Sequence, residues 1–252
     1  PQATPKRTED LRPRGIREGW GTTLEVYDSV ASYLEDGYKV VQFDFPGFGG
    51  SSEPREAWDV GRYTDFFVKF MAELHIDSAI IIAHSFGGRI VLKLYQRGNV
   101  PFTIEKLVMV DAAGIMPVRT RKQKAKIKRY KIIKKIVDSR IISDFFPDLV
   151  EDWRSRQGSE DYRRATPVMK QVLVKSVNED LKEALPLVNA DTLIVWGDKD
   201  TATPISDAHM MDERIPESGL VVFEGAGHYS FLEKPALFRS IVREYLGLGG
   251  DK

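Results

Sequence analysis

The sequence predicts an α/β fold: a mostly parallel central sheet flanked by helices, with a helical cap inserted into it. Two observations carry this prediction. Short apolar runs alternate with amphipathic stretches along most of the chain, and strands that alternate with helices form parallel sheets. The alternation then stops between residues 114 and 189, where helical patterns follow one another without a convincing strand.

The elements follow in chain order. Residues 79–85 form a continuous, β-branched run, which is typical of a strand buried on both faces. In all, the apolar runs predicted to be strands are 38–45, 79–85, 106–112, 192–198 and 220–228. The helical patterns between them cover 24–35, 63–74, 87–97 and 236–246. We therefore expect residues 1–113 and 190–252 to form the core domain and residues 114–189 to form the cap.

The composition is that of an ordinary globular protein. The chain has 252 residues, of which 42% are hydrophobic and 29% are charged. It contains no cysteine, which excludes disulfides, thiolate metal sites and a cysteine nucleophile. No apolar run approaches the roughly 18 residues of a membrane-spanning helix, and residues 1–19 lack the apolar stretch of a signal peptide. These features predict a cytoplasmic location.

Charge is balanced overall but unevenly distributed. Residues 119–140 hold eleven basic side chains opposed only by Asp138, although the chain as a whole has 37 basic and 37 acidic residues. The simplest interpretation is the solvated face of a helix. The alternative is a surface that attracts anionic substrates or an anionic membrane. Nucleic acid is not an expected partner, because the segment contains a single aromatic residue, Tyr130.

A candidate nucleophile lies between a predicted strand and a predicted helix. Ser85 stands in the stretch Ala-His-Ser-Phe-Gly-Gly at 83–88. A sharp strand-to-helix turn needs small neighbours, and it would raise the Ser85 hydroxyl above the carboxyl edge of the sheet. The N–H of Phe86 would then point to where an oxyanion forms. The alternative interpretation is an ordinary turn with a serine that caps the helix.

A serine nucleophile needs a base, and His228 is the best candidate. It lies in a glycine-rich loop after the last predicted strand, whereas His75 and His209 fall on helical stretches. His84 adjoins the serine, but the alternation of side chains along a strand directs it elsewhere. The base in turn needs a carboxylate, for which Asp198 and Asp200 follow the fourth predicted strand. Spacing alone does not separate these two.

Together these motifs resemble the α/β-hydrolase family, and the resemblance covers about residues 18–248. It rests on Ala-His-Ser-Phe-Gly-Gly, Trp-Gly-Asp-Lys-Asp at 196–200 and Gly-Ala-Gly-His at 225–228, in the order serine, aspartate, histidine. In the family the acid usually stands three residues after the glycine of the Trp-Gly pair, which selects Asp200 and keeps Asp198 as second choice. The stretch Asp-Phe-Pro-Gly-Phe-Gly-Gly-Ser at 44–51 resembles a structural loop of the family beside the site.

The N-terminal part departs from the family pattern. The family's second oxyanion donor implies Trp20 here, but Glu18 stands where the family has histidine. The preceding residues 8–17 are rich in charge and contain Pro13. In the family this strand lies between those expected at 38–45 and 79–85. Either residues 8–17 pair there despite their composition, or the site is remodelled, or the N-terminus is altered.

The resemblance implies a serine hydrolase of the carboxylesterase type, with Ser85, His228 and Asp200 as the catalytic residues and Phe86 and Trp20 at the oxyanion hole. No metal or organic cofactor is implied. The bond is ester-like, with amide or C–C hydrolysis as alternatives, and the apolar cap residues predict a small-molecule substrate with an apolar acyl or ring group. The competing hypothesis is a catalytically impaired binding protein with the same fold. The substrate itself cannot be named from the sequence.

Overall fold

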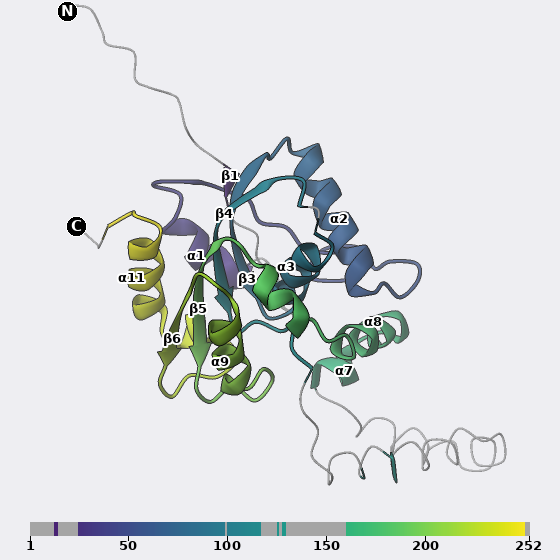
Figure 1. Cartoon of the computed structure of the whole chain (residues 1–252). Coiled ribbons are helices and arrows are strands. Elements are labelled where there is room, and N and C mark those ends of the chain that lie inside the picture. The colour runs from purple at the N-terminus through teal and green to yellow at the C-terminus, as the bar shows by residue number, and fades with distance from the viewer. Residues whose placement is uncertain are drawn as a thin grey trace, which may run out of the picture.

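The computed structural model describes residues 13–14, 25–98, 100–116 and 160–249, together with isolated helical positions at 125, 128 and 129. Figure 1 shows a sheet with helices on both sides, as the sequence predicts. The strands are β1 (Pro13–Arg14), β2 (Lys39–Val40), β3 (Ser78–His84), β4 (Thr103–Val110), β5 (Asp191–Gly197) and β6 (Ser218–Phe223). Most of the basic segment 119–140, and Trp20, lie outside the described residues.

The helices alternate with these strands except between β4 and β5. In chain order they are α1 (Glu25–Ser32), α2 (Val60–Glu73), α3 (Phe86–Gln96), α7 (Glu160–Arg164), α8 (Pro167–Val177), the 3₁₀ helix η1 (Lys182–Leu187), α9 (Ile205–Arg214), α10 (Ser230–Glu233) and α11 (Pro235–Tyr245). The sequence patterns predicted α1, α2, α3 and α11 to within a few residues.

Four parallel strands form the main sheet in the order β3-β4-β5-β6. β1 and β2 form a separate parallel pair, in which Pro13 faces Lys39 and Arg14 faces Val40. Because β1 also lies beside β3, residues 13–14 occupy the position between β2 and β3. Of the alternatives for the N-terminal segment, pairing in the central position is therefore observed at these two residues.

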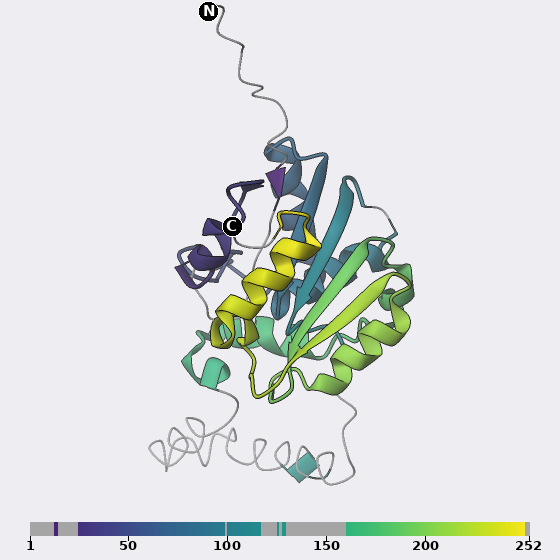
Figure 2. The ribbon, with the colours of Figure 1, turned by 90° about the vertical axis from the view of Figure 1, so that its left-hand side faces the viewer.

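Side chains alternate between two hydrophobic layers on the faces of the sheet. On β3, Ala79, Ile81 and Ala83 belong to the layer formed with α2, α3 and α9. Ile80 and Ile82 belong to the opposite layer, formed with α1 and α11. Figure 2 shows α11 lying across this second face. The even-numbered residues of β3, His84 included, thus face α1.

Hydrogen bonds join the first residues of the predicted insertion 114–189 to residues 180 and 181. Leu181 N–H donates to the carbonyl oxygen of Gly114 over 2.9 Å, and Met116 N–H donates to the Asp180 carboxylate over 3.2 Å. Within the described part of the insertion, Met169 and Val172 of α8 are buried in the same layer as α2 and α3. Met169 and Val172 therefore pack against the core domain.

Candidate active site

The turn between β3 and α3 holds Ser85 in a left-handed backbone conformation, with φ 47° and ψ −111°. Such a conformation costs a non-glycine residue on the order of 1–3 kcal/mol and persists only when neighbours enforce it. Both backbone groups of Ser85 are held here: its N–H donates to Val110 O over 3.1 Å, and its carbonyl oxygen accepts from Gly88 and Ala113 N–H at 3.0 and 2.8 Å. The end of β4 therefore fixes the turn.

Gly88 allows this close approach between α3 and the segment after β4. A Cβ at Gly88 would lie 2.7 Å from the Cβ of Ala112 and 2.7 Å from the carbonyl oxygen of Ala113. Any larger residue would push the helix away from the sheet and pull the Ser85 turn out of shape. Steric crowding therefore explains why the second glycine of the Ser-Phe-Gly-Gly stretch has no side chain.

Three side chains from three strand ends form one hydrogen-bonded chain. Ser85 Oγ, after β3, lies 2.9 Å from His228 Nε2. His228 Nδ1, in the loop after β6, lies 2.7 Å from Asp200 Oδ2, in the loop after β5. Ser85 and Asp200 are buried, and the His228 side chain keeps 20% of its surface exposed. The structure thus brings together the serine, histidine and aspartate that the sequence selected, at the carboxyl edge where parallel sheets bind ligands.

Asp200 lies in a loop that stabilises its ionised form. Its Oδ1 accepts hydrogen bonds from Ala202 and Thr203 N–H at 2.7 and 3.0 Å, and Thr203 Oγ1 lies 2.6 Å from its Oδ2. Burial alone would raise the pKa of this carboxyl, but the hydrogen bonds from His228 and Thr203 outweigh burial, and the net pKa is lowered. Asp200 is therefore a carboxylate that can face the cationic form of His228.

Asp198 is directed to another partner. Its Oδ1 accepts from Gly225 N–H over 2.6 Å, and its Oδ2 lies 3.0 Å from Lys199 Nζ. The hydrogen bond from Lys199 lowers its pKa. Asp198 therefore ties the β5 loop to the turn after β6, and it is Asp200 that contacts the histidine.

Asp111 is a residue of the site that the sequence analysis missed. It follows β4 with φ 44° and is fully buried. Its Oδ1 accepts from Gly197 N–H over 2.9 Å, and its Oδ2 lies 3.0 Å from Ser230 N and 2.6 Å from Ser230 Oγ. The carboxyl thus links the end of β5 to the residues just after His228. A carboxylate directly after a buried strand was the available signal for it.

The first turn of α3 presents the N–H of Phe86 beside the serine, at a helix N-terminus where amides point outward. The Phe86 ring is stacked on Phe48 at 5.2 Å between centroids. Phe48 belongs to the loop 44–51, in which Gly50 N–H donates to Asp44 Oδ2 over 2.9 Å. This loop therefore packs beside the site and positions Phe86 through aromatic contacts. Trp20, the other expected oxyanion donor, lies outside the described residues.

The remaining histidines lie away from the serine hydroxyl. His75 and His209 are exposed, after α2 and on α9 respectively. His84 is 2% exposed and faces α1. Within the described ranges, no three His, Cys, Asp or Glu side chains are grouped so that they could hold a metal ion. In the same part of the chain, no helix is long and apolar enough to cross a membrane.

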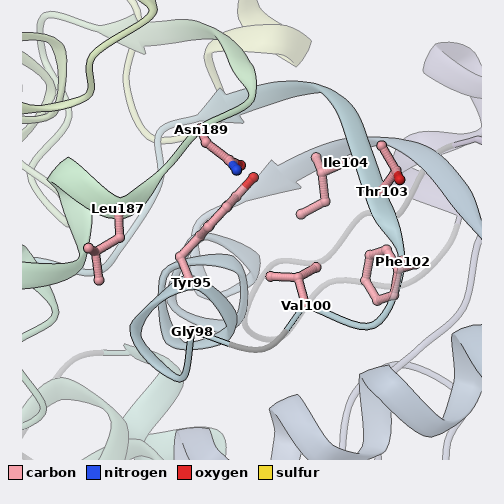
Figure 3. A pocket seen from close by; sticks show the side chains of 8 residues that line it. All are labelled: Tyr95, Gly98, Val100, Phe102, Thr103, Ile104, Leu187 and Asn189. Carbon is pink, nitrogen blue, oxygen red and sulfur yellow. The ribbon is translucent and has the colours of Figure 1, made fainter.

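A separate hollow lies at the opposite end of the sheet. It measures about 600 Å³ and is lined by residues at the end of α3, at the start of β4 and after η1. Figure 3 shows Tyr95 and Asn189 on one side of it and Phe102 and Ile104 on the other. It lies at the amino end of β4, whereas Ser85, Asp200 and His228 follow the carboxyl ends of their strands. The hollow is therefore not part of the candidate active site.

Comparison with known proteins supports the same fold. A family model described as alpha/beta hydrolase fold matches residues 16–235. An uncharacterized protein of Mycobacterium tuberculosis is 25% identical over 90% of this chain and 73% of its own length. The 2-hydroxymuconate semialdehyde hydrolase of a Pseudomonas species is 26% identical, over 86% of this chain and 79% of that protein. The solved structure of an esterase from Exiguobacterium antarcticum superimposes with a TM-score of 0.70 at 23% identity, covering 94% and 92% of the two chains. Because the family model spans most of the chain, and the fold and relatives agree with it, this protein belongs to the alpha/beta hydrolase fold family.

Proposed function

We propose that this protein is a serine hydrolase that cleaves an ester-like bond through an acyl-enzyme formed on Ser85. The observation that carries the proposal is the unbroken chain from Ser85 Oγ to His228 Nε2 at 2.9 Å and from His228 Nδ1 to Asp200 Oδ2 at 2.7 Å. A nucleophile in reach of a base, which is itself oriented by a carboxylate, is the arrangement that acyl transfer needs.

In the first half of the reaction, Ser85 Oγ attacks the carbonyl carbon of the substrate and its proton passes to His228 Nε2. The imidazolium that forms is stabilised by the Asp200 carboxylate at Nδ1. The substrate oxygen becomes an oxyanion, for which Phe86 N–H is the proposed donor, with Trp20 as the second. The oxyanion collapses, the bond to the leaving alcohol breaks, and His228 returns the proton to the alcohol oxygen.

In the second half, water attacks the acyl-enzyme while His228 takes one of its protons. Collapse of the second oxyanion breaks the bond to Ser85, which regains its proton from His228 and releases the acid. The lowered pKa of Asp200 supports this sequence, because an ionised carboxylate is required in every step that charges the histidine.

The proposed substrate is a small molecule with an apolar acyl or ring group. The aromatic layer of Phe45, Phe48 and Phe86 beside the turn supports an apolar setting. Residues 114–189 are proposed as a cap over the core formed by 1–113 and 190–252, which fits the hydrogen bonds that join residues 114 and 116 to residues 181 and 180. The similar proteins include an esterase and a 2-hydroxymuconate semialdehyde hydrolase. After ester hydrolysis, C–C hydrolysis is therefore the second reaction to test, and amide hydrolysis is the third.

The test is covalent labelling with a fluorophosphonate probe, combined with hydrolysis of p-nitrophenyl acetate and butyrate. We expect the probe to attach to Ser85 and the ester to be hydrolysed. Ser85→Ala should lose both, with a rate loss of several orders of magnitude. Ser29→Ala, an exposed serine on α1, is the matched control and should retain both. A folded protein that binds esters but is neither labelled nor active would instead be the impaired binding protein.

A further inference from the structure

We infer that His84 and Tyr27 act as a positioning pair that holds the backbone of His228 in place for proton transfer with Ser85. This inference rests on the proposed function, because it concerns the same histidine. It assigns a role to a buried histidine that the triad does not use. His84 and Ser85 are neighbours in the sequence, and they contact the two ends of the same residue.

The geometry consists of two hydrogen bonds in series. His84 Nε2 lies 2.8 Å from the carbonyl oxygen of His228. On the other side of the ring, His84 Nδ1 lies 2.9 Å from the hydroxyl oxygen of Tyr27. Ser85 Oγ contacts the ring of His228, 2.9 Å from its Nε2. Two neighbouring residues therefore contact His228: His84, at the end of β3, contacts its backbone, and Ser85 contacts its side chain.

The partners determine which nitrogen of His84 carries the proton. A carbonyl oxygen can only accept, so Nε2 must bear the hydrogen that it donates to His228. In the neutral ring Nδ1 is then an acceptor, and the Tyr27 hydroxyl supplies the matching donor. Burial, with the positive charge on a protonated His228, lowers the pKa of His84 to about 3. His84 thus offers a hydrogen-bond donor without adding a second positive charge beside His228.

Tyr27 is itself firmly placed. It is 4% exposed on α1, and its ring is stacked on Phe231 at 5.3 Å with an interplanar angle of 7°. The His84 ring also packs edge-on to Phe231 at 5.2 Å and lies 5.2 Å from the ring of Tyr229. Tyr229 directly follows His228 in the chain, and Phe231 lies three residues after it. The pair therefore stabilises the whole His228 loop against the face of the sheet that carries α1.

Positioning matters because proton transfer is sensitive to small displacements. A shift of about 1 Å at a reacting group can cost on the order of 100-fold in rate. Hydrogen bonds from Gly225 N–H to Asp198 and from Gly227 N–H to Glu233 hold the loop just before His228, and His84 adds a restraint at the His228 carbonyl itself. Without the hydrogen bond to its carbonyl, His228 should sample positions in which Nε2 is out of reach of Ser85.

The test uses Tyr27→Phe, His84→Leu and His84→Gln, with Tyr95→Phe as the matched control. Tyr95 is also a buried tyrosine, but it lies by the hollow at the far end of the sheet. Rates of p-nitrophenyl acetate hydrolysis are divided by the amount of protein that a fluorophosphonate labels at completion. This normalisation removes the contribution of unfolded protein from the comparison. Chemical denaturation of each variant is run in parallel.

We expect His84→Leu to lower kcat by about 10–100-fold and Tyr27→Phe by a smaller factor, with KM little changed. His84→Gln should recover part of the loss, because its amide N–H can donate to the His228 carbonyl. Tyr95→Phe should match the wild type. In ¹⁵N spectra of labelled histidine, His84 should carry its proton on Nε2 in the wild type and in Tyr27→Phe, because the His228 carbonyl accepts from Nε2 in both.

Two results would overturn the inference in distinguishable ways. If Ser85 is labelled and active, but the Tyr27 and His84 variants keep wild-type normalised kcat, the pair has only a structural role. If wild-type Ser85 is neither labelled nor active, the proposed function fails first, and the assignment of His84 to proton transfer fails with it.

Discussion

Gly197, at the end of β5, lies so close to Gly227 that a Cβ on Gly197 would overlap the carbonyl oxygen of Gly227. The same Cβ would overlap the carbonyl oxygen of Ala226. Gly197 precedes the Asp200 loop, and Gly227 precedes His228. This contact therefore sets how closely the acid and the base approach each other.

The first prediction concerns this contact. Gly197→Ala should lower the free energy of unfolding by about 1–3 kcal/mol, because backbone atoms must move to admit the methyl group. It should also lower kcat on the order of 100-fold, since the displaced His228 loop lengthens the bond to Asp200. Ester hydrolysis and chemical denaturation measure the two effects.

Gly219→Ala is the matched control for that variant. Gly219 lies on the neighbouring strand β6, and nothing lies within 4 Å of the position that its Cβ would take. This variant should keep full activity. Equal behaviour of the two alanine variants would show that the close approach at Gly197 is not needed for the site.

The second prediction distinguishes the two aspartates after β5. Asp200→Asn should lower kcat on the order of 10³–10⁴-fold, because an amide cannot balance the charge on His228 and holds it in the wrong tautomer. Asp198→Asn should keep most of the activity, because Asp198 contacts Gly225 and Lys199 instead. Steady-state kinetics on both folded variants decide between them. The opposite ranking would make Asp198 the acid.

Much of the fold could be predicted because the sheet is buried on both faces. The four strands β3 to β6 begin within three residues of their predicted starts, since continuous apolar runs mark them. The ends of β3, β4 and β5 lie within two residues of their predicted ends, but β6 ends five residues early. β4 stops where Asp111 takes φ 44°, and the turn after β6 is made by Gly225 with φ 76°. A positive φ at an aspartate is not visible in a sequence pattern.

The predicted strand 38–45 was mostly wrong. Lys39 and Val40 pair with Pro13 and Arg14, but residues 41–45 form no strand. Phe43 and Phe45 are nevertheless buried. The apolar pattern therefore predicted the burial of these side chains correctly, but it did not predict which residues pair with another strand. Burial depends on composition, whereas pairing depends on a segment elsewhere in the chain.

Within the candidate site, sequence motifs selected the three hydrogen-bonded residues but missed those that hold them. Tyr27 contacts His84 across 57 positions of sequence, and Asp111 contacts Ser230 across 119. No local pattern links such residues, since only the packing of α1 and of the strand ends brings them together. Family motifs therefore identified the candidate residues Ser85, Asp200 and His228, whereas the residues that hold them in place were identified only from the structure.

The third prediction is a pH dependence of stability caused by Asp111. Burial raises its pKa from 3.8 to about 7, against the opposing effect of hydrogen bonds from Ser230 and Gly197. The folded protein therefore binds a proton that the unfolded chain releases between these two pH values. The stabilisation is fully present below about pH 4 and is lost as the pH rises through about 7, by on the order of a few kcal/mol.

Chemical denaturation at a series of pH values between 4 and 8 tests this effect. Asp111→Asn, which cannot ionise, should show a flatter decline in unfolding free energy than the wild type. Asp207→Asn is the matched comparison, because burial raises the pKa of Asp207 only to about 6. The contribution of Asp207 to the decline in unfolding free energy should therefore be complete at about pH 6. An unchanged slope in Asp111→Asn would contradict the assignment.

The last prediction concerns the N-terminal edge of the sheet. β1 and β2 pair over two residues each, whereas β3 and β4 pair along the whole length of β3. Short pairings open at low free-energy cost, so the amides of Arg14 and Val40 should exchange with solvent at least about 100-fold faster than that of Ile81. Pro13 has no backbone N–H and cannot donate to the ladder. Hydrogen exchange followed by mass spectrometry measures the protection, and protection at Val40 equal to that at Ile81 would instead show a complete central strand.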